Sequence, residues 1–315
     1  MVILHSFVGV DEDVYDVHLF RHFLEHYAAQ GIDAFVFDLH SNVGAEDRIA
    51  LFRSMLSGYP AEVRNVVVGP YTAHLNHTDY VNRFLADHGA PDRWCVLVDA
   101  DEFVEFPGGA RSFLDACASE GCNVAIGNLV DRLSLDPPFP PVRPDEPLGA
   151  QFPWTYPLTR QIRRGVDRKV VAVRGRFSCV EGKHRLIEEA PWLGERERAF
   201  MRLVDHIPSP KWRARLARRF WRREPQSEGI RRCTTRLAVH HFAWDAVLLR
   251  KMQRRAQMPG LTHPTEIRNV LKFLSDPAPL EKRLRRHLLT PAGGFGEGAI
   301  SGGGTALSEK PQLLR

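Results

Sequence analysis

The chain has 315 residues, of which 43% are hydrophobic, 10% aromatic and 26% charged. This composition is that of a globular protein and excludes a wholly disordered or fibrous chain. No stretch approaches the roughly 20 apolar residues of a membrane-spanning helix, and the first residues lack the cationic segment of a secretory signal, so we expect a cytoplasmic protein.

Charge divides the chain into two unlike halves. Residues 1–150 contain 9 Arg, no Lys and 23 Asp or Glu, a net charge of −14, whereas 151–315 carry a net charge of +19. An acidic half suits a divalent cation and a basic half suits phosphates, so the asymmetry favours a cleft for an anionic ligand. It would also suit contact with nucleic acid or a membrane.

The first half alternates short apolar runs with segments of helical spacing. We expect strands at 2–8, 32–37, 63–68 and 94–98, with helices at 14–30, 46–57 and 78–87 between them. Such βα units predict an α/β fold with a mixed, mostly parallel sheet flanked by helices. Ligands of these folds lie at the carboxyl ends of the strands, where Asp11 to Asp13, Asp38 and Asp99 to Glu102 are expected.

Regularity is expected to fail from 128 to 160, where the proline-rich run 136–144 predicts a rigid extended loop. Strands are expected again at 169–173 and 236–242, and helices near 245–257, 265–275 and 279–288. After Thr290 the Gly/Ser-rich composition predicts a mobile tail. We therefore divide the chain into a domain over 1–260 with halves 1–127 and 128–260, C-terminal helices over 261–290 and a tail over 291–315.

Five scattered cysteines form no C-x-x-C pair, so neither a zinc site nor a disulfide framework is expected. They are Cys95, Cys117, Cys122, Cys179 and Cys233. We interpret them as buried, reduced thiols.

The sharpest signal for chemistry is Asp99-Ala100-Asp101-Glu102-Phe103, which follows the apolar run 94–98 directly. Two carboxylates spaced i, i+2 at a strand end can address one hard cation, and Mg²⁺ or Mn²⁺ prefers such oxygen ligands together with phosphate oxygens. The motif predicts a metal and diphosphate site.

This motif, the opening segment 6–13 and the later His240-His241-Phe242-Ala243-Trp244 resemble glycosyltransferases of the family-2 type with the GT-A fold. The resemblance covers roughly residues 1–260. It implies transfer of a sugar from a UDP-, GDP- or TDP-linked donor to a small-molecule, glycan or lipid-linked acceptor. It also implies a divalent metal, Mn²⁺ or Mg²⁺, that bridges the D-x-D motif and the diphosphate.

The resemblance assigns roles to particular residues. The first loop would contact the nucleotide, Asp38 would hold another part of the nucleoside, and Asp99 would serve both metal and sugar-phosphate. The first-loop residues are Phe7, Val8, Gly9 and Glu12. The family commonly has an Asn-Glu pair in this loop, whereas this chain has Val10-Asp11-Glu12-Asp13, so Asp11 or Asp13 could equally cap the following helix.

His241, in a His-aromatic pair, would complete a metal shell with Asp99 and Asp101. Because adjacent strand residues point to opposite faces, only one of His240 and His241 should reach the metal. His184, in a G-x-H element, is a second candidate for the diphosphate or acceptor side. Lys251 and Arg255, at i, i+4 on one helix face, could stabilise the departing diphosphate or form a solvated basic surface.

An inverting transfer also needs a base for the acceptor hydroxyl. We expect Asp131 in this role, with Glu102, Asp136 and Glu181 as alternatives. A retaining enzyme would need no such base.

The segment 211–223 carries seven cations and no acid. It could lie on anionic lipid, which would place the protein peripherally at a membrane, or pack against the acidic first half. Competing functions are a nucleotidyltransferase acting on a sugar phosphate, although the Gly-rich phosphate loop usual near the first strand of such enzymes is missing here, and a basic lipid- or nucleic-acid-binding protein. Nucleic acid is the less favoured partner because no recognisable binding motif accompanies the charge.

Overall fold

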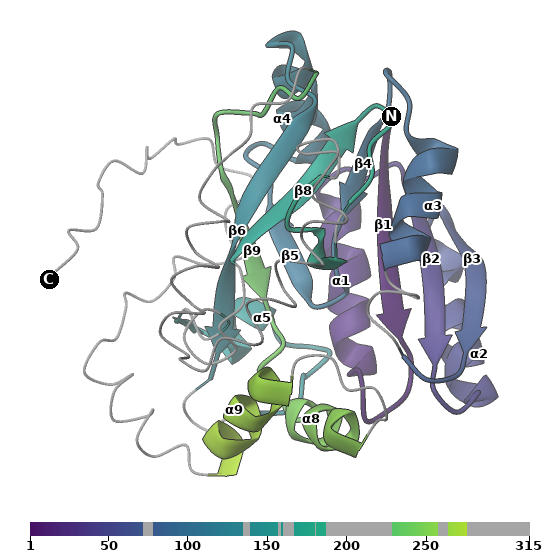
Figure 1. Ribbon diagram of the computed structural model, residues 1–315, viewed down its shortest axis with the longest axis vertical. Helices are drawn as coiled ribbons and strands as arrows, with labels where there is room; N and C mark the ends of the chain where they lie inside the picture. The colour runs from purple at the N-terminus through teal and green to yellow at the C-terminus, as the bar shows by residue number, and fades with distance from the viewer. Residues whose placement is uncertain are drawn as a thin grey trace, which may run out of the picture.

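The structure is a computed structural model that describes residues 1–71, 78–134, 139–156, 159, 167–179, 181–186, 229–257 and 264–275. Within them, nine strands form one sheet in the order β3-β2-β1-β4-β8-β6-β9-β5, with β7 paired to β6 (Figure 1). Helices lie on both faces, so the expected mixed α/β class is confirmed, and the arrangement is consistent with the Rossmann-like GT-A architecture.

The strands are β1 Val2–Gly9, β2 Ala34–Ser41, β3 Ala61–Val68, β4 Trp94–Leu97, β5 Glu102–Glu105, β6 Val124–Leu133, β7 Trp154–Thr155, β8 Arg168–Arg174 and β9 Leu237–His241. The helices are α1 Val17–Ala29, α2 Glu46–Met55, α3 Asp79–His88, α4 Ala110–Ser119, α5 Leu148–Gln151, α8 Leu248–Gln257 and α9 Pro264–Ser275, with short 3₁₀ turns η1 Leu56–Gly58 and η4 Glu181–Lys183.

The sheet joins a parallel half to a mixed half. β3, β2, β1 and β4 run parallel, as the alternating first half predicts. β8 then pairs antiparallel with both β4 and β6, while β9 runs parallel to β6 and antiparallel to β5. The carboxyl ends of β1, β2, β3 and β4 therefore meet at one edge, and this edge faces α8 (Figure 1).

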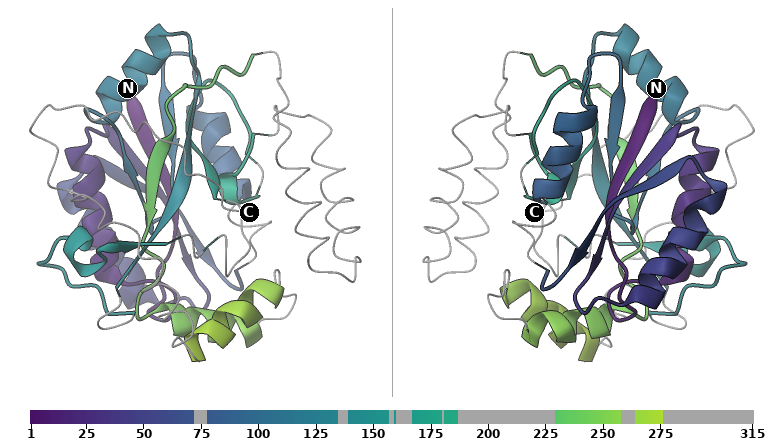
Figure 2. Two further views of the ribbon diagram at one scale, coloured as in Figure 1. Left: turned by 90° about the vertical axis from the view of Figure 1, so that its left-hand side faces the viewer. Right: turned by 90° about the vertical axis from the view of Figure 1, so that its right-hand side faces the viewer.

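Alternating side chains bury both faces of the sheet. Leu4 of β1 packs in one apolar cluster with Phe20 and Phe23 of α1, whereas Ile3 packs in a second cluster with Phe84 of α3. α1 and α3 accordingly cover opposite faces, as Figure 2 shows. The five cysteines are all buried, as expected, and are not joined in disulfides.

The C-terminal helices α8 and α9 close one end of the molecule. They pack together through Leu248, Met252 and Val270 around the fully buried Trp244. The helices expected near 245–257 and 265–275 are thus found as α8 and α9. The expected helix at 279–288, the tail 291–315 and the basic segment 211–223 lie outside the described residues.

Three elements differ from the sequence interpretation. β2 continues to Ser41, so Asp38 lies inside the strand rather than at its end. β6 runs to Leu133, through the region where regular structure was expected to fail from 128, because its residues 128–132 pair with β7, β8 or β9. β5 begins directly after Asp101 and has a glutamate at each end, which hides a four-residue strand from a hydrophobic pattern.

In the part of the chain that the structure describes, no helix is long and apolar enough to cross a membrane.

Tyr27 anchors the edge strand β5 to α1. Its hydroxyl donates to the Glu102 carbonyl oxygen at 2.9 Å and accepts from the Val104 N–H at 3.0 Å. Tyr27→Phe leaves both backbone groups without this partner in a buried place, so we expect a loss of about 1–3 kcal/mol in the free energy of unfolding, measured by urea denaturation. Tyr59→Phe, at a partly buried ring packed on Phe35, is the control and should change it by less than about 0.5 kcal/mol. Equal losses in the two variants would contradict the anchoring role.

Candidate functional site

A pocket of about 270 Å³ lies where the carboxyl ends of β1, β2 and β4 face α8. This is the edge at which open α/β sheets bind ligands. Its lining comes from five strand ends or following loops, from α8 and from η4. The residues are Phe7, Val8, Gly9, Val14, Tyr15, His40, Asn42, Tyr71, Asp99, Ala100, Asp101, Gly182, His241, Lys251, Arg254 and Arg255.

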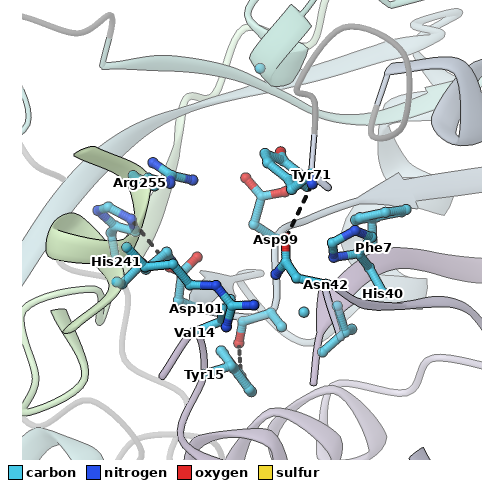
Figure 3. A pocket seen from close by; sticks show the side chains of 16 residues that line it. Phe7, Val14, Tyr15, His40, Asn42, Tyr71, Asp99, Asp101, His241 and Arg255 are labelled. Atoms are coloured by element: carbon cyan, nitrogen blue, oxygen red, sulfur yellow. Dashed lines mark hydrogen bonds and ion pairs between the residues drawn. The ribbon is translucent and has the colours of Figure 1, made fainter. Parts of the chain in front are cut away.

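The sequence predictions are partly brought together here. Eight of the expected site residues line the pocket: Phe7, Val8, Gly9, Asp99, Asp101, His241, Lys251 and Arg255. Glu12, Asp38, Glu102, Asp131 and His184 do not line it. In Figure 3, Arg255 and His241 lie on one side of the pocket, and Phe7 and His40 on the opposite side.

Asp99 is held by two buried lysines. Its Oδ2 lies 3.0 Å from Lys169 Nζ and its Oδ1 lies 2.7 Å from Lys183 Nζ. Lys169 also contacts Glu102 Oε1 at 2.7 Å, and Glu102 accepts the Asp99 N–H. Burial favours the neutral amine, but Asp99 and Glu102 together raise the pKa of Lys169 above its ordinary value. Glu102, expected as an alternative base, therefore serves this charge cluster.

The turn η4 brings Lys183 into the cluster. Gly182 and Lys183 both adopt left-handed backbone angles, with φ of 69° and 56°. The Gly182 carbonyl accepts from Lys169 Nζ at 3.1 Å, and a Cβ at Gly182 would lie 2.6 Å from His184 Nε2. Only glycine fits there without strain. His184 itself turns its Nδ1 to the Arg168 carbonyl oxygen, 2.6 Å away, instead of lining the pocket.

The expected metal-ligand set of Asp99, Asp101 and His241 does not fit a divalent cation. Both oxygens of Asp99 already face ammonium groups, and a cation bound there would lie close to two like charges. At 4 Å and an effective dielectric constant of about 20, each pair of unit charges repels by about 4 kcal/mol. Among the described residues, no group of three or more His, Cys, Asp or Glu side chains is arranged to hold a metal ion.

Asp101 belongs to a different set of contacts. Its Oδ2 lies 3.8 Å from His241 Nε2 and 3.9 Å from Lys251 Nζ. His240 points away from this site and lies 3.2 Å from Glu105, which agrees with the expected alternation along β9. Asp101, His241 and Lys251 therefore form one polar group in the pocket, next to the cluster around Asp99.

Asp131 supports His241 from below the pocket. It is 1% exposed and accepts hydrogen bonds from His241 Nδ1 at 2.8 Å, from the Thr159 N–H at 2.6 Å and from Trp244 Nε1 at 3.1 Å. Burial alone would raise the pKa of its carboxyl, but the hydrogen bonds from His241 and Thr159 outweigh burial and lower it. Asp131 is thus an ionised partner of His241, and it has no face toward an acceptor as the expected base would need.

The first loop is fixed to α8 by ion pairs. Arg254 lies 3.3 Å from Asp11 and also contacts Asp13. Asp11 is buried and accepts from Ser41 and from the Asn42 backbone and side chain. The helix α1 is capped by Asp16, so neither of the two suggested cap residues has that role. The Glu12 side chain is 81% exposed and lies outside the pocket lining.

Asp38 sits in a buried network away from the pocket. Its carboxylate contacts His5 Nε2 at 2.8 Å, Arg64 at 2.7 Å and Asn65 Nδ2 at 2.7 Å. Burial would raise the pKa of Asp38, but these hydrogen bonds lower it. The same burial lowers the pKa of His5 to about 4 despite its bond to Asp38. Asp38 therefore joins β2 to β1 and β3. Asp136 and the Glu181 side chain, the other base alternatives, lie outside the described residues.

The sequence analysis found Phe7 but missed the other two residues of the aromatic wall of the pocket, His40 and Tyr71. Phe7 lies beside His40 and Tyr71, with ring centroids 5.8 and 6.2 Å apart, and the Arg255 guanidinium lies over Tyr71 at 5.9 Å. The Asn42 side chain accepts the Tyr71 N–H at 3.1 Å (Figure 3). His40 lies near the carboxyl end of β2, and Tyr71 follows the end of β3. Their positions at the ligand-binding edge could have been inferred only if β2 had been predicted to continue to Ser41.

No family model and no curated protein matches the chain. Solved structures that share part of its fold include TarS 1–349 of S. aureus in complex with UDP-GlcNAc, at 11% identity and a TM-score of 0.25 over 42% of this chain and 34% of that one. A UDP-glucose pyrophosphorylase from Acinetobacter baumanii matches at 12% identity and a TM-score of 0.30 over 86% and 99% of the two chains.

Asp245, in the turn between β9 and α8, is a buried acid near the pocket. It is 6% exposed and accepts the Val247 N–H at 3.0 Å. Burial raises its pKa to about 7, with Lys251 lowering it and Asp16 and Asp101 raising it. The folded protein therefore holds a proton on Asp245 that the unfolded chain releases near its ordinary pKa of about 3.9.

We expect this proton to make stability depend on pH. A raised carboxyl pKa contributes stability that is fully present below about pH 4 and is lost as pH rises through about 7. Asp245→Asn should remove this dependence. At pH 8 its free energy of unfolding, measured by urea denaturation, should exceed that of the wild type by up to about 4 kcal/mol. The exposed Asp92→Asn is the control. Parallel stability curves for wild type and Asp245→Asn from pH 4 to 8 would contradict the assignment.

Proposed function

We propose that the protein is a glycosyltransferase that moves a sugar from a nucleotide-sugar donor to a hydroxyl group of an acceptor. The observation that carries the proposal is one pocket in which α8 cations, an aromatic wall and a histidine–carboxylate pair face a common space. The resemblance of the D-A-D-E-F region to family-2-type enzymes supports it independently of the pocket.

The donor would lie along the strand ends. Phe7, His40 and Tyr71 form one wall, against which a nucleobase would pack, and Val8 and Gly9 line the pocket beside them. Lys251 and Arg255 approach from α8, where a diphosphate attached to the nucleoside would extend. The sugar would then lie toward Asp101 and His241.

His241 is the group suited to take the acceptor proton. With Asp131 ionised, its Nδ1–H donates to that carboxylate, which fixes the tautomer and leaves Nε2 to accept a proton in the pocket. In an inverting transfer the acceptor oxygen bonds to the anomeric carbon, the bond from that carbon to the diphosphate breaks, and the hydroxyl proton passes to Nε2. Asp131 is then a positioning residue.

A panel of UDP-, GDP- and TDP-sugars tests the proposal. We expect one donor to release its nucleoside diphosphate in the presence of a hydroxyl acceptor. His241→Gln should lower kcat by about 10²–10⁴-fold, since general base catalysis contributes that much, with little change in the Kd of the donor. Asp131→Asn should lower kcat in the same direction because the Nδ1 partner changes.

His18→Gln, at an exposed histidine of α1, is the matched control and should retain full activity. Release of pyrophosphate from a nucleoside triphosphate and a sugar phosphate would instead identify a nucleotidyltransferase. Undiminished turnover by His241→Gln would contradict the role of the histidine.

A further inference from the structure

We propose that this pocket neutralises the donor diphosphate with the cationic side chains of α8, and that donor binding and transfer need no divalent metal. This inference rests on the proposed function and specifies how its leaving group is stabilised. It departs from the metal-bridged diphosphate that the D-x-D motif predicted.

The negative charges around Asp99 are matched by buried lysine ammonium groups. Two carboxylates, Asp99 and Glu102, meet two ammonium groups, Lys169 and Lys183, at 2.7–3.0 Å. Both lysine side chains are at most 5% exposed, whereas the Asp99 side chain is 30% exposed toward the pocket, so the fixed cations lie behind the carboxylate. The carboxylate that a metal would need is thus already neutralised inside the protein by fixed cations.

Asp101, the other acid of the D-x-D motif, also has a cation beside it. Asp101 is the other carboxylate of the lining, and Lys251 Nζ lies 3.9 Å from its Oδ2. Lys251 therefore already places a positive charge beside Asp101. Among the expected metal ligands, Asp101 and His241 lie 3.8 Å apart, and the Lys251 ammonium group lies beside Asp101 as well.

The helix α8 brings positive charge to the pocket. Lys251, Arg254 and Arg255 all line the pocket from α8. Arg254 is paired with Asp11 and Asp13. These ion pairs set α8 against the first loop, so that Lys251 and Arg255 of the same helix lie at the pocket wall. Ammonium and guanidinium groups make short, charge-assisted hydrogen bonds to phosphate oxygens, and such groups stabilise charge as it develops on a leaving diphosphate.

The balance of the reaction needs no further reactant. The bond between the anomeric carbon and the diphosphate oxygen breaks, and its electron pair stays on that oxygen. Lys251 and Arg255 donate hydrogen bonds to the resulting nucleoside diphosphate, while the acceptor proton passes to His241.

Calorimetric titration with UDP, GDP and dTDP, each beside its nucleoside, tests this inference in EDTA and in Mn²⁺. We expect one diphosphate to bind in EDTA with a Kd within about threefold of that in Mn²⁺. Lys251→Met and Arg255→Met should each weaken diphosphate binding by about tenfold or more, because each removes a charge-assisted hydrogen bond, while Lys251→Met leaves nucleoside binding within about twofold. Arg250→Met, at an exposed position of the same helix outside the lining, is the matched control.

The outcomes separate this inference from the proposed function. Binding of a diphosphate only when Mn²⁺ is present overturns the inference and leaves the glycosyltransferase proposal standing. Binding in EDTA that Lys251→Met and Arg255→Met leave unchanged also overturns it, since the charge would be met elsewhere. Failure of all three diphosphates to bind with or without metal overturns both.

Discussion

The pairing of Asp99 with two buried lysines is the constraint on which the site depends. A buried charge that loses its partner costs about 3–5 kcal/mol, so the four members of this cluster must stay together. They come from the loop after β4, the start of β5, the strand β8 and the turn η4. The cluster therefore ties the parallel half of the sheet to the mixed half at the edge where the pocket opens. It also fixes the loop that carries Asp101.

The opposite charges of the two halves of the chain find their explanation in these contacts. The acids of the first half meet the cations of the second directly: Asp99 with Lys169 and Lys183, and Asp11 with Arg254. Part of the charge asymmetry that suggested a metal-bound ligand thus holds the chain's own halves together. Lys251 and Arg255 of α8 line the pocket that we propose for an anionic ligand.

The parallel half of the fold could be predicted because its signals are local. Apolar runs and helical spacing placed β1 to β4 and α1 to α3 within a few residues, and the D-A-D-E-F motif was correctly placed at a strand end. Its chemistry could not be predicted, since the partners of Asp99 lie 70 and 84 residues away along the chain. The residues of the motif also have different roles: Asp99 and Asp101 line the pocket, whereas Phe103 packs in the core against Phe23 and Phe242. Asp38 misled for a related reason: a polar residue inside a strand looks like a strand end when its partners are unknown.

The pocket draws its two walls from separate stretches of sequence. The aromatic wall comes from positions before residue 72, whereas His241 and the three cations fall within fifteen consecutive residues near β9 and α8. Because the two walls come from separate segments, substitutions in the aromatic wall can change which ligand binds without altering the reacting groups in 241–255. A lineage could change its donor through the first strands while it inherits the reacting groups of 241–255, as long as Asp131 stays beside His241.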